Sequence, residues 1–190
     1  MEAEPKVILY IAMSLDGYIA KEDGSVDWLE NAGNGAEGSY LEFYNTIDTI
    51  IMGRKTYDQI LTFGEWGYKG KNTYVLTADT SKNTDNPNIE FVDTDVEDLT
   101  IRLKQESGSN IWLLGGAEII NAFLERRLID EYRITVIPAI IGSGIPLFTA
   151  DTEEHLDFKE VIEYDGIVEL KYEKKKIKIA NFEINNYNNK

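Results

Sequence analysis

The chain lacks cysteine altogether and contains a single histidine, His155. Without cysteine there is no disulfide, no thiolate nucleophile, no iron–sulfur cluster and no cysteine zinc site. One histidine cannot build a multi-histidine metal centre, and we expect no metal site. His155 follows an acidic stretch, where we expect it to be exposed and idle. Catalysis must therefore use carboxylates, hydroxyls, lysine, arginine, backbone amides or a bound cofactor.

Positive charge and long apolar runs are also scarce. The 19 lysines and arginines stand against 34 aspartates and glutamates, which leaves a net charge of −15. So acidic a surface repels nucleic acid and anionic membranes, so we expect a small-molecule substrate. No apolar run approaches the ~20 residues of a membrane span. Residues 1–5 have no basic signal-peptide segment, and we expect a cytoplasmic protein.

What is present suffices for one packed domain, because 43% of the 190 residues are hydrophobic. Apolar runs alternate with amphipathic segments, which predicts an α/β fold with a mostly parallel sheet covered by helices on both faces. We expect strands at 7–13, 49–52, 72–77, 89–92, 111–114 and 132–136. We expect helices at 37–45, 54–60, from the capping box at 94–97 to about 105, and after 115–116. A hairpin of 158–164 and 167–172 adds an antiparallel edge.

Residues 1–174 are predicted to form this single domain, with 18–34 irregular and 175–190 a polar tail. In open α/β sheets, ligands bind at the carboxyl ends of the strands. One such end carries Gly115-Gly116-Ala117-Glu118 before a helix. Glycines allow a ligand to approach the backbone, and the helix start offers N–H groups suited to phosphate. A tight turn that needs a positive φ explains the glycine pair equally well.

A second strand end has the same pattern, with Gly53-Arg54-Lys55-Thr56 opening a short helix. Cations are disfavoured at a helix start, whereas an arginine can form a forked pair of bonds with a phosphate monoester. Solvated side chains are the alternative, but in so acidic a chain we favour the phosphate. Leu76 and Thr77 end a third strand and could add a wall. Two such ends suit the pyrophosphate and 2′-phosphate of a dinucleotide, although neither G-x-G-x-x-G nor a P-loop is present.

Several motifs occur together in an order typical of one family: 12–20 (AMSLDGYIA), 51–57 (IMGRKTY), 113–118 (LLGGAE), 128–131 (LIDE) and 138–144 (PAIIGSG). On these motifs the chain resembles the dihydrofolate reductase-like superfamily. It is most similar there to the reductase domain of the bacterial riboflavin-biosynthesis deaminase-reductase, a 5-amino-6-(5-phosphoribosylamino)uracil reductase. The resemblance covers 6–174. The deaminase domain of that enzyme is absent, and we find no clear basic cluster for a phosphoribosyl substrate.

The resemblance implies NADPH as cofactor and a homodimer that pairs through 134–141 and the final hairpin. It places the 2′-phosphate at Gly53, Arg54, Lys55 and Thr56, the adenosine at Leu76 and Thr77, the pyrophosphate at Gly115, Gly116, Ala117, Glu118 and Ile119, and the nicotinamide near Ala12. The predicted function is an NADPH-dependent reductase that passes a hydride to a C=N or C=O of a small heterocyclic or sugar-derived substrate. The alternative is a non-catalytic or regulatory nucleotide-binding protein on the same fold.

Two carboxylates are candidates for the proton donor. Glu37 lies, counted back from Gly53, near the acid of true dihydrofolate reductases. Helical periodicity groups it with Tyr40, Leu41 and Tyr44 on an apolar face, where desolvation would raise the pKa of its carboxyl. Stabilisation of a first helical turn explains Glu37 equally well. Asp16 follows the first strand near the expected nicotinamide, or simply satisfies a turn.

Overall fold

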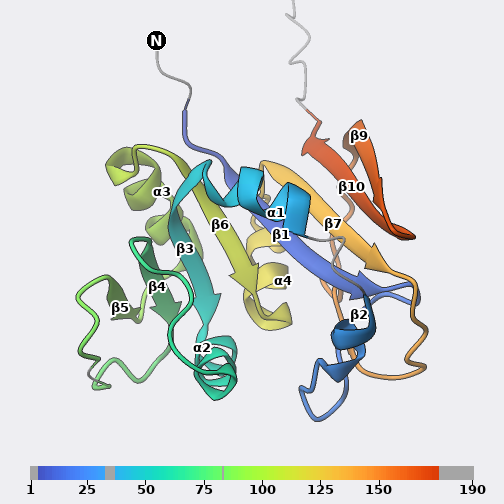
Figure 1. Ribbon diagram of the computed structural model, residues 1–190. Helices are drawn as coiled ribbons and strands as arrows, with labels where there is room; N and C mark the ends of the chain where they lie inside the picture. Colours follow the sequence, from blue (N-terminus) through green and yellow to red (C-terminus); the bar gives the residue numbers. More distant parts are fainter. Residues whose placement is uncertain (1–3, 33–36, 83, 176–190) are drawn as a thin grey trace, which may run out of the picture.

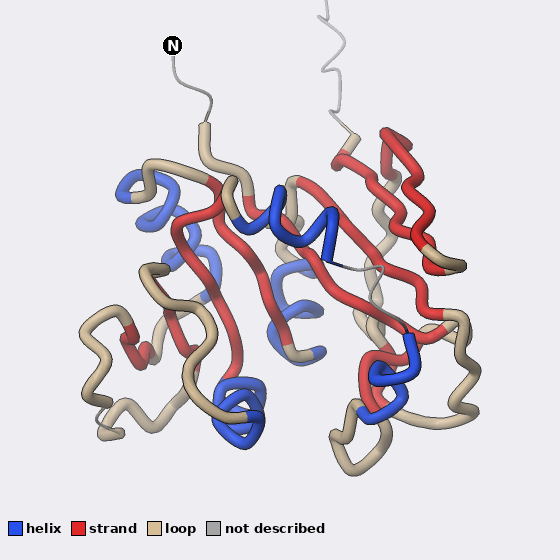
Figure 2. Tube along the Cα trace, in the orientation of Figure 1, coloured by secondary structure: helices blue, strands red, loops and turns tan. Residues whose placement is uncertain are grey.

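A computed structural model describes residues 4–32, 37–82 and 84–175. Eight strands form one twisted sheet in the order β5-β4-β3-β6-β1-β7-β10-β9, with helices on both faces (Figures 1 and 2). The strands are β1 Val7–Ser14, β3 Ile47–Gly53, β4 Asn72–Leu76, β5 Ile89–Val92, β6 Asn110–Gly115, β7 Glu131–Ile137, β9 Leu156–Tyr164 and β10 Ile167–Lys174. The first six are mutually parallel, and the β9–β10 hairpin is antiparallel, which confirms the predicted α/β fold.

The helices divide between the two faces of the sheet. They are α1 Glu37–Tyr44, α2 Arg54–Ile60, α3 Val96–Glu106 and α4 Ala117–Glu125. Leu99 of α3 and Phe123 of α4 belong to a core cluster on one face, whereas Phe43 of α1 and Tyr57 of α2 belong to a cluster on the other. Strand β1 lies between β6 and β7, under helices on both sides. Its continuous apolar run is the pattern of a strand buried on both faces.

Two local predictions need correction, and one element was not predicted. The segment 18–34, expected to be irregular, contains strand β2 (Tyr18–Ala20), paired with β8 (Ile145–Pro146), and the 3₁₀ helix η1 (Asp27–Ala32). A second 3₁₀ helix, η3 (Leu61–Phe63), follows α2. The cap of α3 is Asp95 rather than Thr94, because the Asp95 carboxylate accepts the N–H of Glu97 at 2.8 Å. The polar tail beyond 175 lies outside the described residues. Of the helices within them, none has the length and apolarity needed to span a bilayer.

Candidate functional site

The two glycine turns lie side by side because β3 and β6 are neighbours in the sheet. Hence α2 and α4 start next to each other at the same edge (Figure 1). A Cβ atom added to Gly53 would lie 2.9 Å from Cγ1 of Ile119, and one added to Gly116 would lie 3.1 Å from Oγ1 of Thr56. Gly115 has a φ of +130°, which favours glycine. We call Gly53, Thr56, Gly115, Gly116 and Ile119 the glycine cradle.

The start of α4 opens into this cradle. Gly116 is its N-terminal cap and has no side chain, so no side-chain hydrogen bond closes the first turn. The leading N–H groups of a helix lack partners within the helix, and the hydrogen bonds of the described residues include none donated by the N–H of Ala117 or Glu118. The Glu118 carboxylate is turned outward and accepts Lys55 Nζ at 2.8 Å. Both side chains of that pair are highly exposed, so the pair adds about 0–1 kcal/mol to stability.

The predicted residues on the neighbouring strands line the same edge. Leu76, which ends β4, is in register with Gly53, and Thr77 donates its N–H to the carbonyl of Val92 at the end of β5. Ala12 lies on β1, which is the other neighbour of β6. The predicted cofactor residues therefore come from four adjacent strands, β4, β3, β6 and β1, and from the two helices that follow β3 and β6.

Arg54 lies beside the cradle with part of its guanidinium engaged. Its Nε donates to Asp58 Oδ2 at 2.7 Å, one turn along α2. Within the described part of the chain, the two Nη groups have no hydrogen-bond partner. An arginine held through Nε keeps the planar Nη face available for a forked contact to a phosphate or carboxylate.

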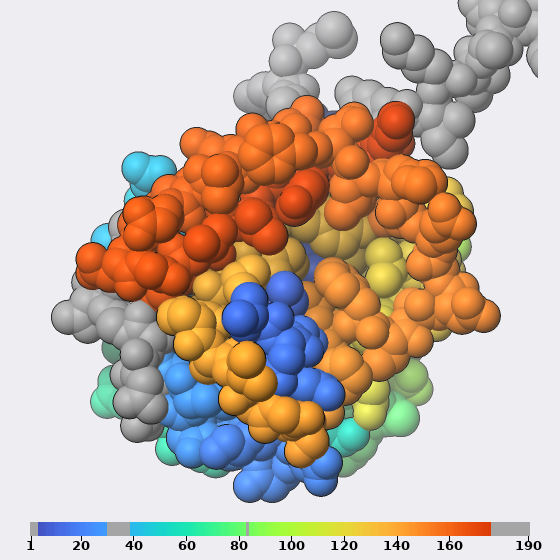
Figure 3. All heavy atoms as spheres, turned by 90° about the vertical axis from the view of Figure 1, so that its right-hand side faces the viewer, coloured from blue at the N-terminus to red at the C-terminus, as the bar shows by residue number. Residues whose placement is uncertain are grey.

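Asp16 joins two loops at this edge. Its carboxylate accepts the Ser14 hydroxyl at 2.6 Å and the N–H groups of Ile141 and Gly142 at 3.2 and 2.8 Å. These contacts, the Ser14 hydrogen bond foremost, lower the pKa of the Asp16 carboxyl. The segment after β1 lies directly against the segment after β7 (Figure 3). Asp16 is an ionised, exposed anchor between these loops, which is a poor state for donating a proton.

Glu37 is the first residue of α1, and its side chain lies outside the described part of the structure. The orientation of α1 differs from the predicted one. Ser39 and Phe43 face the sheet and are buried, whereas Leu41, predicted on the inner face, is 61% exposed. The buried contacts of Ser39 and Phe43 decide this rotation, and spacing along the helix could not reveal them.

A buried carboxylate that the sequence did not reveal lies beneath α1. Glu169 of β10 is 1% exposed, and its Oε2 accepts the Ser39 hydroxyl at 2.6 Å. The Tyr10 hydroxyl lies 3.1 Å from Ser39 Oγ, and burial raises the pKa of this phenol. Thr135 of β7 pairs in register with both Ala12 and Glu169. Glu169 thus lies two strands, or ~10 Å, from the expected nicotinamide position. Its Oε1 has no partner in the described ranges.

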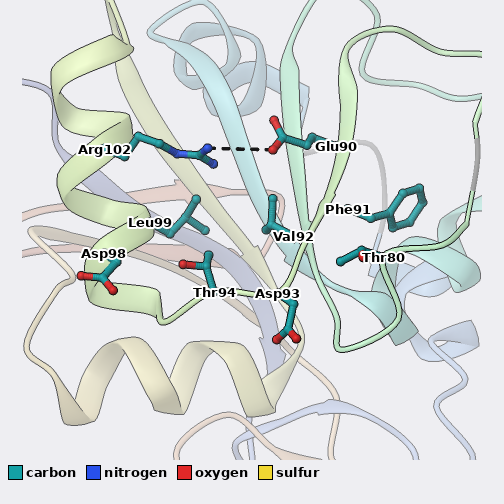
Figure 4. Close-up of a pocket in the computed structure, with 9 residues that line it drawn as sticks. All are labelled: Thr80, Glu90, Phe91, Val92, Asp93, Thr94, Asp98, Leu99 and Arg102. Atoms are coloured by element: carbon teal, nitrogen blue, oxygen red, sulfur yellow. Dashed lines mark ion pairs between the residues drawn. The ribbon is translucent and has the colours of Figure 1, made fainter.

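A hollow of about 430 Å³ lies elsewhere, between β5 and α3 (Figure 4). It is lined by Thr80, Glu90, Phe91, Val92, Asp93, Thr94, Asp98, Leu99 and Arg102. None of these is a predicted site residue. Arg102 lies 3.9 Å from Glu90, and two further carboxylates line the wall. This balance of charge does not suit an anionic ligand, although Phe91 in the lining lies next to Arg54.

His155, expected to be exposed and without a role, is exposed. Its side chain is 78% accessible, and Nε2 lies 3.1 Å from Glu153. Over residues 4–32, 37–82 and 84–175, no group of three or more histidines and carboxylates is arranged to hold a metal ion.

Comparisons with known proteins agree with this geometry. The family model described as RibD C-terminal domain matches residues 5–63 and 65–168. The uncharacterized protein YwjB of Bacillus subtilis (strain 168) is 45% identical over 171 residues, which cover 89% of this chain and 98% of YwjB.

Two solved structures extend the comparison. A putative riboflavin biosynthesis protein from Shewanella sp. PV-4 superimposes with a TM-score of 0.78 at 29% identity, over 90% of this chain and 99% of the other. Dihydrofolate reductase from Enterococcus faecalis, in complex with NADP(H) and RAB-propyl, gives a TM-score of 0.67 at 14% identity, over 91% and 98% of the two chains. The latter likeness concerns the fold alone. The glycine turns, the dihydrofolate reductase-like sheet and the match along most of the sequence together place this chain in the family of RibD C-terminal domains.

Proposed function

We propose that the chain is an NADPH-dependent reductase that transfers a hydride to a C=N or C=O group of a small heterocyclic or sugar-derived substrate. The observation that carries the proposal is the glycine cradle, where two helix starts converge beside Arg54. Membership of the RibD C-terminal domain family supports a reductase. The NADP(H) bound by the Enterococcus dihydrofolate reductase, which shares the fold, supports the choice of cofactor.

The residues present fit NADPH. Gly53 and Gly116 let the two helix starts pack closely, because a Cβ atom at either position would press on Ile119 or Thr56. The backbone N–H groups at the start of α4 would then meet the pyrophosphate. The free Nη groups of Arg54 suit the 2′-phosphate, and Lys55 adds a second positive charge. Leu76 and Thr77 would lie along the adenosine, and Ala12 would lie by the nicotinamide. NADPH supplies the hydride when bound, and the chain binds and orients it.

Hydride addition to the carbon of a C=N or C=O group leaves negative charge on the nitrogen or oxygen, so a proton must be donated to that atom. Glu37 and Asp16 are the proposed donors. The hydrogen bonds that keep Asp16 ionised favour Glu37 of the two. Glu37 opens a helix whose inner face packs on Ile8 and Tyr10 of β1, and we propose that the substrate lies on this side of the sheet.

We expect a substrate chemically similar to that of the riboflavin-pathway reductase, but we do not propose that this protein acts in that pathway. Arg54 and Lys55 are committed to the cofactor in this proposal, and the sequence shows no clear basic cluster for a second phosphate. We therefore propose a compact acceptor that presents an imine or carbonyl carbon. Mass spectrometry of ligands that co-purify with the protein would identify it.

Calorimetric titration with NADPH and NADH tests the cofactor assignment. Removal of Arg54 in Arg54→Ala deletes a charge-assisted contact worth ~1.5–3 kcal/mol, so NADPH should bind about tenfold to a hundredfold more weakly. NADH binding should barely change. Arg102→Ala, which removes an arginine from the hollow beside α3, is the matched control. Equal losses of both cofactors on Arg54→Ala would rule out the 2′-phosphate assignment.

Stopped-flow mixing of the NADPH-loaded protein with imine and carbonyl acceptors separates a reductase from a nucleotide-binding protein. Loss of NADPH absorbance on mixing supports the enzyme. Tight, NADPH-selective binding without oxidation by any acceptor, including the co-purified ligand, would favour the non-catalytic alternative.

A further inference from the structure

A lysine outside the family motifs shares a carboxylate with Arg54. Lys82 lies in the loop between β4 and β5, and its Nζ lies 2.8 Å from Oδ1 of Asp58. Oδ2 of the same carboxylate accepts Arg54 Nε at 2.7 Å. Burial acts to raise the pKa of Asp58, but the hydrogen bonds from Lys82 and Arg54 outweigh it and leave that pKa below its ordinary value. One ionised carboxylate therefore holds two cations from different elements.

Each of the two cations lies over the face of an aromatic ring. Lys82 Nζ lies 5.5 Å from the ring centre of Tyr57, and Arg54 Cζ lies 5.7 Å from that of Phe91. The two rings pack edge to face with their centres 5.2 Å apart. A cation within about 6 Å of an aromatic face is attracted to it. The rings thus restrict where the two positive groups can lie before a ligand arrives.

The local charge balance explains why a cation besides Arg54 and Lys55 is needed, since the charge of Lys55 is balanced by Glu118 at 2.8 Å. Asp79 stands near the pair; its carboxylate accepts the N–H and hydroxyl of Ser81, and these bonds lower the pKa of Asp79. Asp58 and Asp79 together carry two negative charges, against one on Arg54. Without Lys82 the cluster would repel a phosphate dianion, and Lys82 restores neutrality. The side chains of Arg54, Lys82 and Asp58 are 27%, 36% and 45% exposed, so a ligand can reach them.

We propose that Lys82 binds a phosphate monoester together with Arg54, and that Asp58 positions both cations. This inference rests on the proposed function, under which the monoester is the 2′-phosphate of NADPH. The β4–β5 loop then contributes to the cofactor site, and selection of NADPH over NADH depends on two residues that are distant in sequence.

Lys82→Met tests the inference by direct binding. Calorimetry with NADPH and NADH at low and high salt should give about a tenfold loss of NADPH affinity, from one lost charge-assisted contact. NADH affinity should change less than twofold, and the salt dependence of NADPH binding should weaken because one ionic contact is gone. Lys82→Arg should restore most of the NADPH affinity, since it keeps the charge.

Lys159→Met is the matched control. Lys159 lies on β9, at the opposite edge of the sheet from β5, and pairs with Glu173 at 2.9 Å. Lys159→Met removes the same charge from the protein as Lys82→Met does. It should leave the affinities for NADPH and NADH unchanged, and this result would exclude an effect of net charge. Thermal denaturation of each variant verifies that it is folded.

Two results would overturn the inference in distinguishable ways. If Lys82→Met weakens both cofactors equally or neither, while the unmodified protein prefers NADPH, then Lys82 only anchors its loop and the proposed function still stands. If the unmodified protein binds neither nucleotide, the proposed function fails, and the inference fails with it.

Discussion

Substitution of Gly53 by alanine probes the contact that joins the two halves of the cradle. The Gly53 backbone, with φ −82° and ψ 160°, is extended and open to any residue, so its conformation adds no cost. The added Cβ would instead lie 2.9 Å from Cγ1 of Ile119, an atom close to the α4 backbone. Relief requires α2 and α4 to separate or Ile119 to leave its rotamer. Overpacking of this kind costs about 1–3 kcal/mol.

Urea denaturation of Gly53→Ala should therefore show a loss of about 1–3 kcal/mol in the free energy of unfolding. NADPH and NADH should both bind more weakly, and by the same factor, because the substitution changes the cradle and leaves Arg54 in place. This equality separates it from Arg54→Ala, which should affect NADPH alone.

A second substitution makes the reasoning refutable. Ile119→Ala removes Cγ1, so the double variant Gly53→Ala/Ile119→Ala should lose less stability than the two single losses combined, by about 1 kcal/mol or more. Additive losses, or a Gly53→Ala protein of unchanged stability, would show that the Ile119 contact does not explain the glycine.

Three further predictions concern the acid, the assembly and pH. Once a substrate is known, Glu37→Gln should lower kcat about 10²–10⁴-fold with NADPH affinity intact, and a larger loss in Asp16→Asn would reassign the acid. The protein should form a homodimer through the region of β7, β9 and β10, where the edge strand exposes Phe158 (58%) and Val161 (55%); a 21.6 kDa particle in light scattering at micromolar concentration would contradict this. Hydrogen bonds from Lys159 and Lys6 lower the pKa of Glu173 to about 2. The contribution of Glu173 to the stability of the folded protein should therefore be complete above pH 4.5 and be lost as the pH falls toward 2. Glu173→Gln should thus lower the unfolding free energy at pH 7 by about 1 kcal/mol, discounted for partial exposure, and flatten this acid limb.

Short stretches of consecutive residues were enough to predict individual strands, helix starts and turns. The apolar run of β1 predicts a strand buried on both faces, and the two glycine turns predict strand ends that open into helices. The hairpin around Asp165-Gly166 was also found where the turn signal placed it. These features depend on period, cap and turn chemistry, which act over a few neighbouring residues.

Side-chain facing was less predictable. Glu169 alternates with apolar neighbours on β10. This alternation shows that the strand has a polar and an apolar face, but it does not show which face another element covers. The structure covers the polar face with α1, so Glu169 meets Ser39 instead of water. Leu41 illustrates the converse, because the helix that would have buried it rotates to bury Ser39 and Phe43. Whether Glu169 or Leu41 is buried depends on which element packs against it, and the local sequence pattern does not identify that element.

The sequence alone thus predicted the α/β class and a set of cofactor residues at the carboxyl edge of a sheet. Only the tertiary structure brought β6 between β3 and β1, and so set the two glycine turns side by side. It also brought Lys82 from a separate loop to the carboxylate that holds Arg54. The physical reason is that strand order and loop placement follow from burying apolar surface against elements distant in the chain, whereas turns, caps and alternation follow from each residue's immediate neighbours.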